Sequence, residues 1–444
     1  MIELMEKKET QKTRRNGLLA LSPLFVMILT FVGLSFCCGG FSKVPILIVF
    51  LITSAYSLLT LRGLRTDERI AVFSRGAAEE NLLLMVWIFI LAGGFASAAE
   101  SMGAIKAVVN LCLHLLPSGF LLPGMFLAAC FISLSVGTSV GTIVALVPVA
   151  AGLAAPTGLR QDVFVGAVVS GAFFGDNLSF LSDTTVVATR SQGCRMTDKF
   201  RMNLRIALPA ALLALCVFYG LGRDAMPATV PDSDYSLLHV APYLVVLLSA
   251  LMGLNVILAL ALGLCLTGLC SLALGTFDVN EWFASICGGV GGMSELVMVS
   301  MMAGGLFAVI RRGGGITWML RLLTRRVSTP RGANLSIAAL VGLTNLYTAN
   351  NTVAILSVGG LARDITERFG LDPRRTASLL DTFSCVVQGL IPYGAQMLIA
   401  GGLSNLEPLS LIPFVCYPAL LGIMALLSIL LPRIRCCVPK KESV

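Results

Sequence analysis

Long apolar stretches, separated by short polar segments, recur along the whole chain. A helix that crosses a bilayer needs about 20 mainly apolar residues. Stretches of this kind lie at about 18–36, 44–61, 82–99, 103–117, 121–155, 162–189, 205–221, 237–252, 254–274, 294–310, 315–329, 334–361, 377–401 and 412–431. The pattern predicts an all-α polytopic membrane protein with about 12 to 14 transmembrane helices. Residues 18–431 form a single transmembrane domain in this prediction, between short tails at 1–17 and 432–444.

The composition excludes a soluble enzyme. Of 444 residues, 56% are hydrophobic and 13% are charged, whereas about 25% are charged in ordinary globular domains. The net charge of +8 does not indicate a nucleic-acid partner, because the bases lie between apolar stretches, as orientation signals do. No arrangement of nucleophile and base is visible, and no Cys or His spacing is typical of a metal site. We therefore expect a protein in the lipid bilayer that is not an enzyme, with no cofactor and no metal other than a transported ion.

The basic residues orient the chain. They cluster at residues 7–15, 62–75, 190–205, 363–375 and 433–441, which alternation of the spans puts on one side. The base-free stretch 276–292 falls on the other side, as an external loop. The positive-inside rule then predicts cytoplasmic termini in a bacterial-type inner membrane. The stretch 315–329 carries arginines on the outer side, so we expect a tilted or partly interfacial helix there.

A weak internal repeat divides the chain into two halves. Ala92-Gly93-Gly94 recurs as Ala303-Gly304-Gly305, Thr138 and Thr142 recur as Thr348 and Thr352, and Asp176-x-x-Ser179-x-x-x-Asp183 recurs as Asp381-x-x-Ser384-x-x-x-Gln388. Equivalent loops carry bases on opposite sides, so the repeats at about 44–189 and 254–401 are predicted to be inverted. Secondary transporters place substrate and coupling-ion sites where such repeats meet.

Polar or glycine-rich residues interrupt four of the long apolar stretches, at 137–142, 175–179, 348–352 and 388–392. Opened backbone is tolerated at membrane depth only where protein buries it or where it lines a wet cavity. Its free carbonyls and helix ends can bind a small cation or a carboxylate. Close helix crossings use similar residues, and this alternative stays open. We predict discontinuous helices, with backbone sites at Thr138, Ser139, Thr142, Asn350, Asn351 and Thr352.

Three aspartates, Asp176, Asp183 and Asp381, lie within these apolar stretches. An ionisable group there costs about 2.5 to 3.5 kcal/mol, and no Lys or Arg shares the same stretches. Lys106 is the obvious candidate for a base from elsewhere. Burial disfavours a charged carboxylate and a bound cation favours it, so a proton and a cation compete for one group. The predicted ion-binding and proton-coupling residues are these aspartates with Asn177, Ser179, Thr184, Ser384 and Gln388.

Residues 175–185 read G-D-N-L-S-F-L-S-D-T-T, which resembles the G-D-x-x-S-P-x-S-D-T-T pattern of the NhaC-type sodium:proton antiporter family. Residues 137–142 are similar to the G-T-S-x-G-T helix break of that family, and residues 390–392 to its L-I-P-W element. The resemblance implies sodium:proton exchange, with Asp176 and Asp183 at or near the ion site and Asp381 where the family often has an acid. Phe180 replaces the usual Pro, and Gln388-Gly389 replaces a Ser-Pro. Relatives of similar sequence exchange organic acids or amino acids.

These features predict a secondary active transporter that exchanges cytoplasmic sodium for external protons, with lithium as a further ion. Neutralising Asp176 or Asp183 is expected to abolish exchange. A sodium- or proton-coupled carrier of a small carboxylate or amino acid is the alternative, with the anion on helix ends near Thr142 or Asn351. A channel-like or scaffold membrane protein is a third possibility, and oligomers are compatible with all three.

Overall fold

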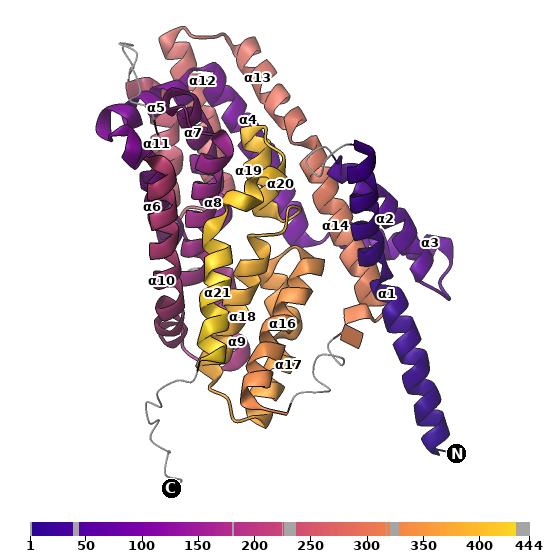
Figure 1. Cartoon of the computed structure of the whole chain (residues 1–444). Coiled ribbons are helices and arrows are strands. Elements are labelled where there is room, and N and C mark those ends of the chain that lie inside the picture. The colour runs from indigo at the N-terminus through magenta and orange to yellow at the C-terminus, as the bar shows by residue number, and fades with distance from the viewer. Residues whose placement is uncertain are drawn as a thin grey trace.

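The protein is built from α-helices, as its sequence predicts (Figure 1). A computed structural model describes residues 2–38, 44–179, 182–223, 225, 237–316, 318–319 and 328–431, with only the backbone of residues 2–16, 81, 237, 250 and 251. The regular elements within these ranges are all helical. Phe180, the C-terminal tail at 432–444 and most of the stretch 315–329 lie outside the described residues.

The helices fall into two series along the chain. The first series is α1 (Ile2–Cys38), α2 (Ile46–Thr60), α3 (Thr66–Ala77), α4 (Glu80–Ser101), α5 (Ala104–Leu115), α6 (Ser118–Val136), α7 (Ser139–Thr157), α8 (Gln161–Leu178), α9 (Asp183–Gln192) and α10 (Met196–Gly222). The second series is α11 (Leu237–Leu251), α12 (Val256–Leu274), α13 (Val279–Gly292), α14 (Ser294–Arg312), α16 (Pro330–Thr348), α17 (Asn351–Arg368), α18 (Pro373–Gln388), α19 (Ala395–Ser404), α20 (Pro408–Leu411), the 3₁₀ helix η2 (Ile412–Phe414) and α21 (Cys416–Leu430).

The apolar helices make this an integral, multi-pass membrane protein. Within the described residues, eight helices are long and apolar enough to cross a membrane, and a bent pair, α19 with α20 and η2, would make a ninth. Four further helices of the described residues are apolar but shorter: α2, α5, α11 and α21. The prediction of 12 to 14 spans includes such short helices, and the exact number stays a prediction.

The predicted interruptions at 137–142 and 348–352 are helix breaks. Gly137 ends α6 in the left-handed conformation, at φ 80°, and Thr138 is extended before α7. Ala349 ends α16 with φ 47°, and Asn350 is extended before α17. The sequence repeat aligned Thr138 with Thr348, whereas the backbone makes Thr138 equivalent to Asn350. Ser139 and Asn351 are therefore the equivalent first residues of their half-helices.

The other two predicted interruptions are helix breaks as well. The chain leaves helical geometry at Ser179 and resumes it at Asp183, which separates α8 from α9. It leaves helical geometry again between Gln388 and Ala395, which separates α18 from α19. The prediction of discontinuous helices is confirmed at all four places.

Helices of the first series pack against helices of the second series in matching pairs. Helix α3 packs against α14, and α13 packs against α4; α2 likewise contacts α14, and α12 contacts α4. Near the broken helices, α7 packs against α19, and α17 packs against α9. Such reciprocal packing is what two repeats related by a twofold axis produce. It supports a repeat architecture, while the inverted orientation of the repeats stays a prediction.

Paired glycines let the reciprocal helices approach closely. A Cβ added to Gly76 of α3 would lie 2.5 Å from the carbonyl oxygen of Gly304 in α14. A Cβ added to Gly93 of α4 would lie 2.5 Å from the carbonyl oxygen of Gly289 in α13. Small residues at membrane helix crossings allow this backbone contact. The repeated Gly93 and Gly304 of the sequence thus mark two crossings of the same kind.

Two segments that the sequence analysis treats as loops contain helices. The base-free stretch 276–292 includes α13, whose capping box joins Asp278 and Glu281: Glu281 N donates to Asp278 Oδ1 at 2.8 Å. The basic stretch 62–75 includes most of α3, which begins with the acids Asp67 and Glu68. Capping and acids in the first turn stabilise both helices.

Helix α8 lies in the centre of the bundle and is buried along almost its whole length. A Cβ on Gly171 would lie 2.5 Å from the carbonyl oxygen of Phe126 in α6. Ser133 of α6 also donates from Oγ to the carbonyl oxygen of Ala172 at 2.6 Å. This close contact with α6 fixes the C-terminal end of α8, which carries Asp176.

Candidate ion-binding site

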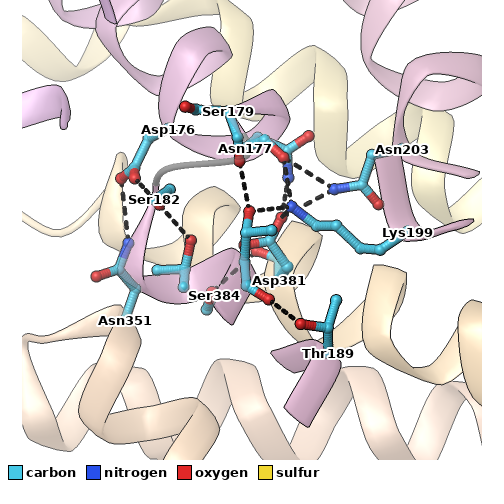
Figure 2. Close-up of polar contacts among 12 residues, drawn as sticks. Asp176, Asn177, Ser179, Ser182, Thr189, Lys199, Asn203, Asn351, Asp381 and Ser384 are labelled. Carbon is cyan, nitrogen blue, oxygen red and sulfur yellow. Dashed lines mark hydrogen bonds and ion pairs between the residues drawn. The ribbon is translucent and has the colours of Figure 1, made fainter. Parts of the chain in front are cut away.

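The buried carboxylate of Asp176 lies where three half-helices begin (Figure 2). It accepts hydrogen bonds from Ser182 Oγ at 2.7 Å, Ser139 Oγ at 3.0 Å and Asn351 Nδ2 at 3.3 Å. Ser139 is the first residue of α7, Ser182 precedes α9, and Asn351 is the first residue of α17. Because helix N-termini carry partial positive charge, this position stabilises a carboxylate.

A polar network continues from Asp176 into the second repeat. Gln396 of α19 donates from Nε2 to Ser139 Oγ at 3.0 Å, and Gln388 Nε2 donates to Gln396 Oε1 at 2.9 Å. Gln388 Nε2 also lies 2.9 Å from the carbonyl oxygen of Ala349, at the break between α16 and α17. Residues at both helix breaks of the second repeat are thus connected to Asp176 of the first repeat by hydrogen bonds.

Hydroxyl groups give this site its chemical versatility. Ser182 Oγ lies 2.8 Å from Thr184 Oγ1, and Ser139 Oγ both donates to Asp176 and accepts from Gln396. A hydroxyl can turn its hydrogen to a carboxylate or offer its lone pairs to a cation. The site can therefore stabilise a bare carboxylate or surround a small cation with oxygen atoms.

A second buried carboxylate, Asp381 of α18, has different partners (Figure 2). Its Oδ2 atom is 2.7 Å from Lys199 Nζ, and it accepts hydrogen bonds from Asn203 Nδ2 at 2.8 Å and Asn177 Nδ2 at 2.9 Å. The side chains of Lys199 and Asp381 are 1% and 0% exposed, so this ion pair is fully buried. The charge of Asp381 is neutralised inside the protein.

The base that pairs with a buried aspartate is Lys199, so the prediction of Lys106 is wrong. In the sequence, Lys199 is one of the bases of the 190–205 segment, which were interpreted as orientation signals. Lys106 is exposed on α5, whereas Lys199 is one of the largest fully buried side chains. Helix α10 begins at Met196, well before the predicted apolar stretch, and this extra length brings Lys199 into the bundle.

The periodicity of α10 carries a signal that could have found Lys199. The buried residues of this helix include Ile206, Ala207, Ala210 and Ala214, which follow one helical face. Stepping back along that face by helical spacing reaches Asn203 and then Lys199. Lys199 was missed because a lysine in a basic segment is typical of a solvated charge, and Asn203 was missed because it lies in the same segment.

The remaining predicted aspartate, Asp183, lies apart from these clusters. It is the first residue of α9, and its side chain is exposed. The described residues provide no hydrogen bond or ion pair between Asp183 and Asp176. Its neighbour Thr184 is buried and reaches Asp176 through Ser182.

The other predicted residues occupy structural positions around the two carboxylates. Ser179 caps α8, and its carbonyl oxygen accepts from Thr185 Oγ1 at 2.8 Å. Ser384 Oγ donates to the carbonyl oxygen of Asp381 at 2.9 Å. Thr142 Oγ1 donates back to the carbonyl oxygen of Thr138 at 3.2 Å.

The predicted amides and hydroxyls at the second break form local contacts. Asn350 caps α17 by accepting from Val353 N at 3.1 Å, and Thr352 N donates to Asn351 Oδ1, also at 3.1 Å. Of the six predicted backbone sites, Ser139 and Asn351 contact Asp176 directly, and both do so through their side chains.

Broken membrane helices that meet at buried carboxylates are typical of polytopic transporters. The chain matches the Na+/H+ antiporter family over residues 12–222 and 234–432, and it belongs to this family. The family is one of transporters rather than enzymes, and its members carry out sodium:proton antiport or related transport.

Individual relatives agree with this assignment. The chain is 28% identical to the "Na(+)/H(+) antiporter NhaC" of Alkalihalophilus pseudofirmus over 327 residues, which cover 65% of this chain and 69% of the relative. It is 24% identical to an "Uncharacterized Na(+)/H(+) antiporter" of Haemophilus influenzae, with 92% of this chain and 94% of the relative covered. A "Malate-2H(+)/Na(+)-lactate antiporter" of Bacillus subtilis is 20% identical over 76% of this chain and 78% of the relative.

Proposed function

We propose that the protein is a secondary antiporter that exchanges sodium for protons, with Asp176 as the carboxylate that binds each ion in turn. One observation carries the proposal. Asp176 is buried, and none of its contacts among the described residues is an ion pair with Lys or Arg. Because a buried carboxylate without an ion-pair partner is costly even when it is hydrogen-bonded, a proton or a cation from outside the protein would lower this cost.

Competition at one carboxylate supplies the coupling. A proton on Asp176 removes the charge that attracts sodium, and a bound sodium ion disfavours protonation. The hydroxyls of Ser139 and Ser182 then serve both states, because they donate to the carboxylate or turn their oxygens to the cation. Thr184 Oγ1 takes part through its hydrogen bond with Ser182 Oγ. The amide of Asn351 holds the carboxylate in position.

The other predicted residues have supporting roles in this proposal. Asp183, exposed at the start of α9, attracts cations toward the site through the adjacent Ser182. Asp381 is the equivalent aspartate of the second repeat, and Asn177 links it to the end of α8.

The predicted polar residues support the site more indirectly. Gln388 supports it through Gln396 and Ser139, and Ser179 and Ser384 shape the helix ends. Thr138, Thr142, Asn350 and Thr352 shape the two breaks.

The proposal includes the orientation of the chain. With cytoplasmic basic loops and termini in a bacterial-type inner membrane, the antiporter would export sodium, or lithium, and import protons. The lipid bilayer is then its structural partner, and oligomers are compatible with this arrangement.

A coupled carrier of a small carboxylate or amino acid is the second candidate, since the Bacillus subtilis relative is named for malate and lactate. A substrate carboxylate would need helix N-termini or a free base. In this structure the carboxylate of Asp176 already accepts hydrogen bonds at the N-termini of α7, α9 and α17. The buried base Lys199 is already paired with Asp381. The geometry therefore favours an inorganic cation.

The test uses everted membrane vesicles, energised to be acid inside, in which the internal pH is followed. Sodium, lithium, potassium or candidate organic acids are then added to the outside. We expect prompt alkalinisation with sodium, and loss of this response in Asp176→Asn. A response to an organic acid alone would support the second candidate. Transport that dissipates a gradient but never builds another would point to a channel.

A further inference from the structure

We infer that the ammonium group of Lys199 occupies a second cation site, formed by Asp381, Asn177 and Thr185, which could otherwise bind sodium. The protein thus fills this site with its own side chain. The consequence rests on the proposed function: a single site, at Asp176, is left for the transported cation.

Three oxygen atoms surround the Lys199 ammonium. Nζ lies 2.7 Å from Asp381 Oδ2, 2.7 Å from the carbonyl oxygen of Asn177 and 2.6 Å from Thr185 Oγ1. A carboxylate, a carbonyl and a hydroxyl are the oxygen types that hard cations bind in proteins. Because an ammonium has three donors, these contacts use all of them.

The break between α8 and α9 creates part of this site. Asn177 is next to the last residue of α8, so its carbonyl belongs to the last turn, where carbonyls have no partner within the helix. This carbonyl accepts from Lys199 Nζ and from Asn203 Nδ2 at 3.0 Å. Helix C-termini carry partial negative charge, which favours a cation at this position.

The direction of the hydrogen bonds also fits a cation site. Thr185 Oγ1 donates its own hydrogen to the carbonyl oxygen of Ser179 at 2.8 Å, so its lone pairs face Lys199. Asp381 Oδ1 and Asn177 Oδ1 are buried and accept no hydrogen bond from the described residues. The cluster thus contains more acceptor atoms than Lys199 can satisfy.

The purely structural alternative makes a different prediction. If Lys199 and Asp381 only join α10 to α18, removing the lysine leaves an uncompensated charge that weakens the fold. If the cluster is a cation site, sodium takes the place of the ammonium. Rescue by sodium therefore separates the two roles.

The experiment measures equilibrium binding of radioactive sodium to the purified full chain in detergent, with choline as the control cation. Wild type is expected to bind one sodium ion per chain, and Asp176→Asn none. The double variant Asp176→Asn/Lys199→Ala is expected to regain one site. Adding Asp381→Asn to that double variant should abolish the regained site, and Asp176→Asn/Lys199→Arg should regain none.

Each outcome decides the inference. Two sodium ions on wild type, or no regained site after Lys199→Ala, would overturn it. Lys199→Gln is the second variant, and both are purified in sodium and in choline. Equal instability of both variants in the two salts, or failure to fold even in sodium, would support the structural alternative. If wild type binds no sodium but the double variant does, the proposed function fails while the second site stands.

Discussion

The two buried aspartates of the repeat, Asp176 and Asp381, have the same sequence context but different electrostatic environments. Asp176 accepts hydrogen bonds from neutral side chains at three helix N-termini. Asp381 is paired with Lys199 and accepts from two asparagines. The two copies of the motif therefore place their aspartates in different charge environments, because the partners of each carboxylate come from other helices.

The position of the helix break explains the difference. Helix α8 ends at Leu178, two residues after Asp176, whereas α18 continues to Gln388, seven residues beyond Asp381. Asp176 therefore lies beside the beginning of the next half-helix, α9. Asp381 lies within a helix and depends on side chains from α8 and α10 for its compensation.

The largest expected effect is loss of transport in Asp176→Asn. The amide cannot bind a proton or neutralise a cation, so sodium-dependent proton movement should fall to background in vesicles with normal protein levels. Asp162→Asn is the matched control, because Asp162 is a buried aspartate of the same helix that is paired with Arg160. Full transport in Asp176→Asn would break the comparison.

The next largest effect concerns Asp381. The variant Asp381→Asn leaves Lys199 buried without its partner, which should destabilise the protein by about 3 to 5 kcal/mol. Thermal unfolding of the purified protein measures this loss. The double variant Asp381→Asn/Lys199→Gln removes both charges and should recover most of the stability. Equal instability of the single and double variants would contradict the ion-pair account.

A smaller effect is now expected from Asp183→Asn, in place of the loss of exchange expected from the sequence, because the Asp183 side chain is exposed at the start of α9. If the exposed carboxylate attracts cations but does not hold them, maximal exchange should persist, while the half-saturating sodium concentration rises about fivefold, equivalent to roughly 1 kcal/mol of attraction. The control is Asp67→Asn, which removes an exposed acid from the first turn of α3. Complete loss of exchange would instead place Asp183 with Asp176 as a direct ion ligand.

The smallest effect compares the two equivalent helix breaks. Gly137 and Ala349 both have positive φ, which costs a residue with a side chain about 1 to 2 kcal/mol. Gly137→Ala should therefore lower thermal stability, and Ala349→Gly should raise it by up to about 1 kcal/mol, since glycine also loses more freedom on folding. A stability change of the same sign in both variants would contradict the equivalence of the breaks.

Much of the fold could be predicted from the sequence, because its signals are local. Apolar stretches predicted the membrane helices, and Gly137 and the polar residues around Asn350 predicted breaks that the structure contains. The stretches around α3 and α13 were taken for loops, because their polar first turns conceal the helices. The repeat was visible at Gly93 and Gly304, although the sequence aligned the Thr138 break with Thr348 instead of Asn350.

The sequence by itself determined that the chain is a membrane transporter with broken helices and buried aspartates. Only the tertiary structure decided which aspartate is neutralised, because Lys199 and Asn203 lie far along the chain from Asp381 and reach it through the packing of α10 against α18. Local hydrophobicity sets where helices form and end. The charge of a buried group depends instead on long-range packing, which residue spacing along the chain does not encode.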